Sequence, residues 1–320
     1  MPASAGHHAT LMILWEDEFN DDNPSDDDHK PFGADATLDT LEGSHNAVRV
    51  FAPNNRKAIQ IIEQNFAGSW SASFALTNPW WLRSVIAEAT TTGDSAPFEH
   101  EFSGATPDTF QMIQGTETTD VERVLKGCVT VDASISVDVM GNVEVSLSGV
   151  YADEDKTPDA TLDNQPTIQE RVLHFGHASL SIDGSTVRLV QSLDITINNN
   201  TDLIPELGTR MPVDYSPKEM TVDLSWSDIV NEDDDHLDRF YGGANSLQET
   251  MDNDEDAKIE FDNGLSGGDK NSLELSIEGL FPDSYGRSGI GDPAADLQGN
   301  ISAPSADVTA TAENDEDSAR

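Results

Sequence analysis

Cysteine and long hydrophobic runs are scarce in this chain of 320 residues. Cys128 is the only cysteine, which excludes an intramolecular disulfide and a zinc site built from cysteines. The apolar run ATLMILW near the N-terminus is short, lacks a preceding basic segment and leads directly into an acidic stretch. Such a run is too short to span a membrane and does not resemble a signal peptide. We therefore expect a protein with no membrane span that does not use a secretory signal.

Positive charge is also scarce. The chain has 17 Lys and Arg residues against 60 Asp and Glu residues, giving a formal net charge of -43. At low ionic strength these charges repel one another within the folded chain, whereas at about 1 M salt the Debye length falls to roughly 3 Å. The composition thus predicts a protein adapted to molar salt, and it lacks the basic face of a typical nucleic-acid-binding protein.

Short runs with alternating apolar and polar residues recur along the chain, with turn residues between them. Hydrophobic residues make up 36% of the sequence, which is enough for a substantial core. The runs CVTVDASISVDV and VEVSLSGVYA are joined by Met140-Gly141-Asn142, a pattern typical of a hairpin. The sequence therefore predicts an all-β fold with short flanking helices.

The stretch GSWSASFALTNPWWLRSVIAEA at 68–89 changes period midway. Its first half alternates like a half-buried strand, while Asn78 and Pro79 are typical of a helix start. A similar alternation at 220–226 precedes a second helical pattern. The residues expected to pack these two helices onto a sheet are Trp80, Trp81, Leu82, Val85 and Ile86 in the first and Leu237 and Phe240 in the second.

This similarity predicts that the chain contains two tandem related units, each of ordinary domain size. The alternative is that the similarity arose by chance, because alternating runs separated by glycines are common in β proteins. The expected division is a first β domain at 1–152 with an acidic loop at 17–47, a linker or long loop at 153–169, a second β domain at 170–285 and a C-terminal extension at 286–320.

The motifs of catalysis and cofactor binding give a mostly negative result. His174 and His177 in HFGH are three apart, so on a strand their side chains point to opposite faces and cannot share a metal. The acidic stretch starting at Asp252 resembles a calcium loop, but it has Ala257 in place of the turn glycine and Asn263 in place of the bidentate glutamate. We predict no catalytic, cofactor-binding or metal-binding residues, and no enzyme activity.

The order of several stretches resembles the major tail tube protein of long-tailed, siphovirus-like viruses. The stretches are WEDEFN, FAPNNRKAIQIIEQNFAGSW with the Pro-Trp-Trp-Leu helix, LKGCVTVDASISVDVMGNVEVSLSGVYADE and HFGHASLSIDGSTVRLVQSLDITINNNTDLIPELGTR. The resemblance covers roughly residues 12 to 285, and the acidity suggests a virus of halophilic archaea. It implies a structural virion protein with a β-sandwich or barrel that assembles with itself into stacked rings, in the host cytoplasm.

The resemblance also implies how such rings work. Six tube domains close each ring, supplied by three chains if the unit is duplicated and by six if it is not. The rings form the hollow tail tube through which DNA passes without specific binding, and other tail proteins attach at its ends. For this chain, we expect Asp132, Asp138 and Asp194 to face the lumen or the ring interface, and the loops at 17–47 and 198–217 to bridge rings.

Two other classes of protein stay open at this point. One is an extracellular or capsid-surface β-sandwich binding protein of a haloarchaeon or its virus, which would need an exposed aromatic platform. The other is a β-rich hydrolase, which would need two converging acids at a fixed separation in a pocket.

Overall fold

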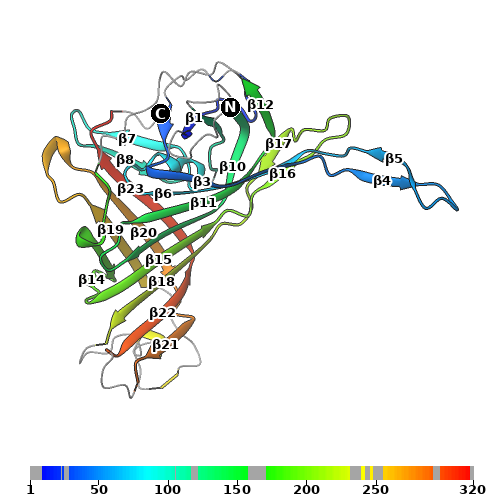
Figure 1. Ribbon diagram of the computed structural model, residues 1–320. Helices are drawn as coiled ribbons and strands as arrows, with labels where there is room; N and C mark the ends of the chain where they lie inside the picture. Colours follow the sequence, from blue (N-terminus) through cyan, green and yellow to red (C-terminus); the bar gives the residue numbers. More distant parts are fainter. Residues whose placement is uncertain are drawn as a thin grey trace.

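The fold is a β-sandwich in which two antiparallel sheets pack face to face, with one long hairpin extending from the body (Figure 1). This arrangement confirms the expected all-β class with short helical segments. In the computed structural model, the described residues are 9–22, 24, 29–104, 106–116, 122–157, 171–230, 239–241, 246–247, 255–290 and 296–317.

The large sheet has 12 strands, and β10 lies at its centre. β10 is long enough to pair with β9 and β12 in its first half and with β11 and β15 in its second. The strands are β1 (Ala9–Trp15), β2 (Lys30–Pro31), β3 (Ala34–Ser44), β6 (Ala67–Ala75), β9 (Phe110–Thr116), β10 (Glu122–Asp138), β11 (Glu144–Tyr151), β12 (Asp153–Thr157), β15 (Val190–Asn198), β18 (Thr221–Ile229), β21 (Ser284–Ser288) and β22 (Gln298–Ser305).

The small sheet has seven strands in the order β14-β13-β19-β20-β23-β8-β7. Two further pairs, β4 with β5 and β16 with β17, form separate hairpins. The strands of the small sheet are β7 (Ala89–Thr92), β8 (Phe98–Phe102), β13 (Ala178–Ile182), β14 (Ser185–Thr186), β19 (Glu255–Asp262), β20 (Ser272–Leu280) and β23 (Asp307–Asn314), and those of the hairpins are β4 (Val48–Phe51), β5 (Ala58–Ile62), β16 (Asp202–Ile204) and β17 (Asp214–Ser216).

The core lies between the inward faces of the two sheets. Trp70, Ala72 and Phe74 alternate along β6 and are all buried, which confirms the strand predicted at the start of the 68–89 stretch. The Trp70 ring packs edge-on against Phe110, with ring centroids 5.6 Å apart. Since apolar side chains on alternate positions share one face of a strand, each strand contributes one row to this core.

The helix predicted after this strand is shorter than expected. It is the 3-10 helix η2 (Trp80–Ser84), and the chain returns to a strand at Ala89. Its start is close to the prediction, because the Asn78 side-chain oxygen accepts a hydrogen bond from the Trp80 amide at 3.3 Å. The five expected packing residues are all buried in the core. The segment is therefore enclosed by the sandwich, instead of lying across it as an amphipathic helix with a solvent-facing side.

Strand pairing crosses the expected division of the chain. β10 pairs with β15 in the large sheet, and the small sheet contains β7 and β8 together with β13, β19 and β20, so both sheets contain strands from both expected units. The residues expected to form a C-terminal extension contain β22 and β23. The two runs matched as repeats, VEVSLSG and LELSIEG, form β11 and β20 and lie in different sheets. The duplication stays a prediction.

Two segments expected to be loops contain strands. The acidic segment at 17–47 contains β3, which pairs with β6 and packs Leu38 and Leu41 partly buried against the core. The segment at 153–169 begins with β12, which pairs with the first half of β10. In both cases the acidic residues lie at exposed or half-exposed positions, so composition alone does not indicate the strand. The described residues also include two short helical turns, η4 (Phe175–His177) and η5 (Gly267–Asp269).

Candidate assembly surfaces

The outward face of the large sheet is covered by small polar and acidic side chains. We call this surface the polar face, and it spans seven neighbouring strands in the order β3, β6, β11, β10, β15, β18 and β22. Its rows are set by register, since Ser134 lies opposite Ser146 on one side and Thr196 on the other. The rows continue to Ser73 on β6 and Asp223 on β18.

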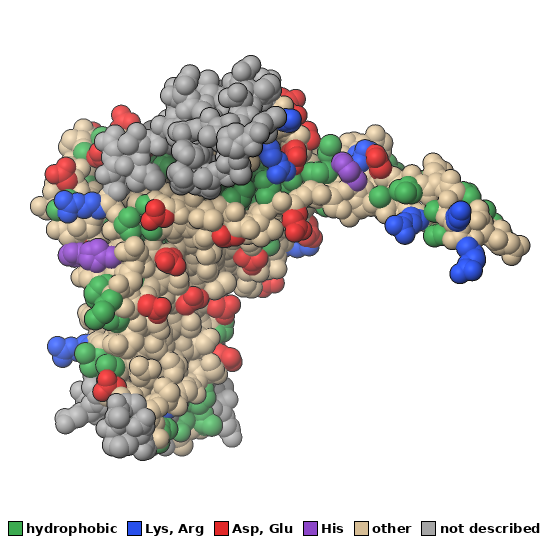
Figure 2. Space-filling view, viewed as in Figure 1, with side chains coloured by type: hydrophobic (Ala, Val, Ile, Leu, Met, Phe, Trp, Pro, Cys, Tyr) green, Lys and Arg blue, Asp and Glu red, His purple; other side chains and the backbone are tan. Residues whose placement is uncertain are grey.

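The polar face has no basic residue on these strands. β3, β6, β11, β15, β18, β22 and the part of β10 from Val129 to Asp138 contain no Lys or Arg. Figure 2 shows the body below the arm as mostly uncharged surface with separate acidic groups. A surface without cations has no group to pair with phosphate, so it offers no electrostatic attachment point to a nucleic acid.

Asp132, Asp138 and Asp194 all lie on the polar face. Asp132 accepts hydrogen bonds from Asn198 Nδ2 at 2.5 Å and from Ser148 Oγ at 3.4 Å. Asp194 is on β15, in register with Ser136, and its carboxylate accepts a hydrogen bond from Thr196 Oγ1 at 3.4 Å. The structure therefore brings the three predicted aspartates to one surface, where each is at least partly open to solvent.

The outward face of the small sheet has a different chemistry. It carries many acidic groups together with basic partners, and we call it the acidic face. Lys258 on β19 pairs with Glu274 on β20 at 2.7 Å. Lys270 pairs with Glu313 on β23. The two outward surfaces are thus distinct, one formed largely by hydroxyl groups and one by carboxylates with ion pairs.

The hairpin β4–β5 projects from the body and shows almost no buried residue. We call residues 46–62 the arm (Figure 1). Its apolar side chains are open to solvent, with exposed fractions of 55% for Phe51, 59% for Ile59 and 63% for Ile61. The arm also contains Arg49, Arg56 and Lys57 and no acidic residue, and Figure 2 shows these basic and hydrophobic groups along it.

The base of the arm is held by the neighbouring segment around β16–β17. The Arg210 carbonyl accepts a hydrogen bond from the Phe66 amide at 2.8 Å, and its guanidinium contacts Glu63 at 2.6 Å and His45 at 3.0 Å. Tyr215 anchors the second hairpin by donating to the Pro107 carbonyl at 2.9 Å. These contacts therefore fix the arm at the point where it leaves the body.

The arm was missed by sequence reasoning as a separate feature. AIQII is one of the short alternating runs and predicts an ordinary strand, whereas the segments expected to bridge neighbours are 17–47 and 198–217. A signal was present nonetheless, because three of the 17 basic residues of an acidic chain fall within the arm. Clustered charge of the rare sign is typical of a contact surface.

The remaining predicted residues have mixed outcomes. His174 and His177 lie at the short turn η4 and not on a strand, so their rings come within 5.1 Å of each other, contrary to the expected opposite faces. Among the described residues, no group of three His, Cys, Asp or Glu side chains is placed to hold a metal ion. Phe240 is half-buried and packs on Tyr285, with centroids 6.2 Å apart. Leu237, Asp252 and Asp254 lie outside the described residues.

A half-buried acidic group, Glu16, lies where β1 ends against the bend of β10. The Glu16 carboxylate accepts hydrogen bonds from the amides of Gly127 at 2.8 Å and Asn20 at 3.2 Å. Burial nevertheless raises its pKa to about 7. The adjacent Cys128 is fully buried, and burial raises the pKa of its thiol, so this cysteine is neither accessible nor ionised at neutral pH.

Comparison with known protein families gives one match. Residues 6–312 match the family model described as phage tail tube protein. No curated protein matches the chain. Within the part of the chain that the structure describes, no helix has the length and apolar character needed to cross a membrane.

Proposed function

The chain belongs to the phage tail tube protein family, a structural and not an enzymatic family, and on that premise we propose that it forms stacked rings around a channel for DNA. In this proposal the polar face lines the channel and the acidic face lies on the outside of the tube. The protein is then a component of the virion tail, and other tail proteins cap the tube.

The observation that carries the proposal is the absence of Lys and Arg from six adjacent strands of the polar face and from the part of β10 between Val129 and Asp138 that lies among them. Protein affinity for DNA comes largely from basic side chains that replace counterions at phosphates. A wall of hydroxyl groups with scattered carboxylates forms no such contacts, so DNA slides along it without being held. Asp132, Asp138 and Asp194 then face the channel, as expected from the sequence.

We propose six chains per ring. The two expected units share both sheets, since β10 pairs with β15 in the large sheet and the small sheet contains β8 together with β13, β19 and β20, and this supports counting each chain as one wall segment. Mass measurement of the smallest ring distinguishes the possibilities, because six chains give six times 34.6 kDa and three chains give half that mass. The net charge of -43 supports a virus of halophilic archaea as the source, with assembly in the host cytoplasm.

The test of the polar face uses cysteine accessibility in assembled tubes. Ser134→Cys on β10 places a thiol on the polar face, and Ser276→Cys on β20 places a matched thiol on the outward side of the small sheet. The native Cys128 is fully buried and stays silent. Tubes formed in molar KCl and seen by negative-stain microscopy are treated with a maleimide attached to a large polymer.

We expect the polymer to label Ser276→Cys in both tubes and dissociated subunits. Ser134→Cys should be labelled in subunits and protected in tubes, because the polymer cannot enter the channel. Equal labelling of the two variants in tubes would contradict the assignment of the polar face. A chain that stays monomeric at high concentration in molar salt would contradict tube formation altogether and favour the surface-binding β-sandwich.

A further inference from the structure

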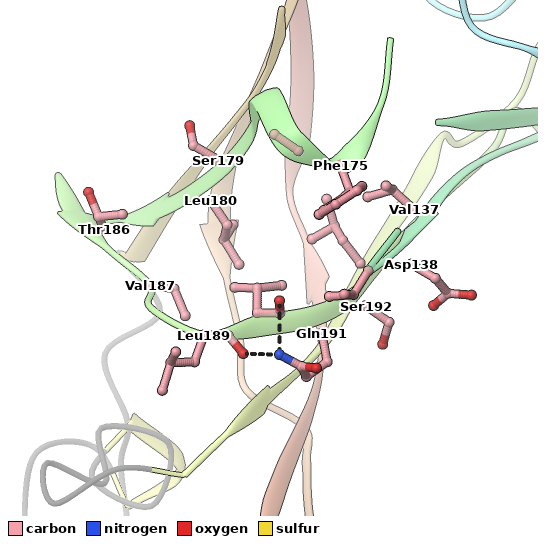
Figure 3. Close-up of a pocket in the computed structure, with 14 residues that line it drawn as sticks. Val137, Asp138, Phe175, Ser179, Leu180, Thr186, Val187, Leu189, Gln191 and Ser192 are labelled. Carbon is pink, nitrogen blue, oxygen red and sulfur yellow. Dashed lines mark hydrogen bonds between the residues drawn. The ribbon is translucent and has the colours of Figure 1, made fainter. Parts of the chain in front are cut away.

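An apolar groove opens at one end of the sandwich, where the two sheets separate. Its floor is formed by the buried side chains of Val137, Leu180 and Leu193, and its rim by Phe175 and Leu189. Figure 3 shows Val137 from β10, Phe175 from η4 and Leu180 from β13 around one space, with Leu189 on the segment that leads into β15. The exposed fractions of Phe175 and Leu189 are 41% and 53%, so the groove presents apolar surface to solvent.

Leu189 has an unusual backbone on this rim. Its φ is +59°, a left-handed conformation that is unfavourable for a leucine. The Gln191 side chain holds the segment by donating to the Leu189 carbonyl at 3.0 Å and to that of Val190 at 3.4 Å (Figure 3). A strained residue that keeps a large apolar side chain in solvent points to a contact that is made outside the isolated chain.

The arm presents apolar side chains that have no core of their own. A two-stranded hairpin alone buries too little surface to be stable in water, and Phe51, Ile59 and Ile61 stay exposed along it. Exposed apolar groups on this scale mark an interaction site. The arm and the groove therefore each expose apolar surface that requires a partner.

The two surfaces lie on opposite sides of the molecule. Figure 1 shows the arm extending to one side of the body and β14, which borders the groove, on the other. A chain cannot place its own arm in its own groove in this arrangement. A donor element on one side and an acceptor on the other is the geometry of a heterologous interface, which repeats from copy to copy.

Charge supports the same pairing. The arm carries Arg49, Arg56 and Lys57 and no acid. The β13–β14 turn beside the groove carries the exposed Asp183, whose carboxylate accepts a hydrogen bond at 3.0 Å from the amide of Asp256, a second exposed acidic residue. Arg188 is the one basic residue on the segment between β14 and β15. A basic arm is therefore matched to a surface with an acidic surround.

From these observations we infer that the arm of one copy docks in the groove of a second copy, with its apolar side chains over Leu180 and Leu189 and its basic residues near Asp183. The inference rests on the proposed self-assembly, and it names the contact through which neighbouring copies recognise each other. The occupant is a second copy of this chain.

Intermolecular disulfide formation tests the contact directly. Full-length Phe51→Cys and Leu189→Cys proteins are mixed in molar KCl under mild oxidation, and the matched control replaces Leu189→Cys by Ile290→Cys, another exposed apolar position. We expect about tenfold more mixed disulfide dimer with Leu189→Cys, because docking raises the local concentration of the two thiols. Equal amounts with both partners would overturn the inference.

Electron microscopy of the same samples separates this inference from the proposed function. If tubes form without the selective cross-link, the proposed function stands and the groove is refuted as the docking site of the arm. The selective cross-link in oligomers that are not tubes would support the groove and refute the tube.

A second variant separates docking from folding. Leu189→Gly removes the side chain and relieves the left-handed backbone, so it should fold at least as well as the parent chain while assembling several-fold less. Unchanged assembly of a folded Leu189→Gly protein would also overturn the inference.

Discussion

Replacing the half-buried Glu16 by glutamine should change the pH dependence of stability in a way that the structure specifies. Burial raises the pKa of this carboxyl group from 4.5 to about 7. Below pH 4.5 the Glu16 carboxyl group is protonated in both the folded and the unfolded chain, so it does not destabilise the fold. Its ionisation then costs stability progressively as the pH rises through about 7.

The magnitude follows from the shift and from the hydrogen bonds. One pKa unit corresponds to about 1.4 kcal/mol, so the charged carboxylate lowers the free energy of unfolding by at most about 3.4 kcal/mol above pH 8. Glu16→Gln removes this cost and keeps an oxygen for the Gly127 amide. Its NH₂ group cannot accept from the Asn20 amide, which costs about 1 kcal/mol. The net gain is about 2 kcal/mol at pH 8.

Urea unfolding in molar KCl at pH 8 and pH 4 measures this effect, with Glu18→Gln as the exposed control. Glu16→Gln should be more stable than the parent chain at pH 8 and slightly less stable at pH 4, where only the lost hydrogen bond remains. Glu18→Gln should change little at either pH. A Glu16→Gln protein whose stability difference has the same size at both pH values would refute a Glu16 carboxyl group that retains its proton in the folded state.

Three further changes have defined outcomes. Burial lowers the pKa of His100 below its free value of 6.5. Its contribution to stability is therefore present above pH 6.5 and is lost on acidification. His100→Gln should flatten the fall in Tm between pH 7 and pH 5. Gly149→Ala should lower the free energy of unfolding in urea by about 1–3 kcal/mol, because its Cβ would lie 2.0 Å from the Val129 carbonyl and 2.8 Å from the Trp70 ring. The control Gly286→Ala places its Cβ in open space and should leave the stability unchanged. Dialysis to low salt should abolish the circular dichroism of the fold or its oligomers, and an unchanged spectrum would contradict adaptation to molar salt.

The sequence predicted individual strands well where one face is buried. β6 and β18 alternate because every second side chain enters the core, and the pattern is local. β3 was missed because its exposed positions are acidic and mask the half-buried Leu38 and Leu41. Pairing across the chain, such as β8 with β23, leaves no local signal, because antiparallel partners are selected by long-range packing.

The same difference between local and long-range signals applies to the three aspartates of the polar face. Asp132 and Asp138 are six residues apart on one strand, so strand parity alone predicts that they share a face. That Asp194 joins them depends on the register of β15 against β10, which the sequence does not encode locally. The groove could not be predicted, because it forms where β13, β15 and η4 meet only in the folded chain.

The distribution of charge explains how such an acidic chain can polymerise. Copies with a net charge of -43 repel one another, and screening by molar salt removes most of this repulsion without providing any attraction. Attraction must come from apolar contact, which salt strengthens, and from the few basic groups available. The arm combines both, because it exposes Phe51, Ile59 and Ile61 beside Arg49 and Lys57. Placing bases on the arm also keeps them away from the polar face, where they would hold DNA. The few basic residues can therefore help copies of the chain to bind one another without holding DNA, provided that they lie on the arm and not on the channel wall.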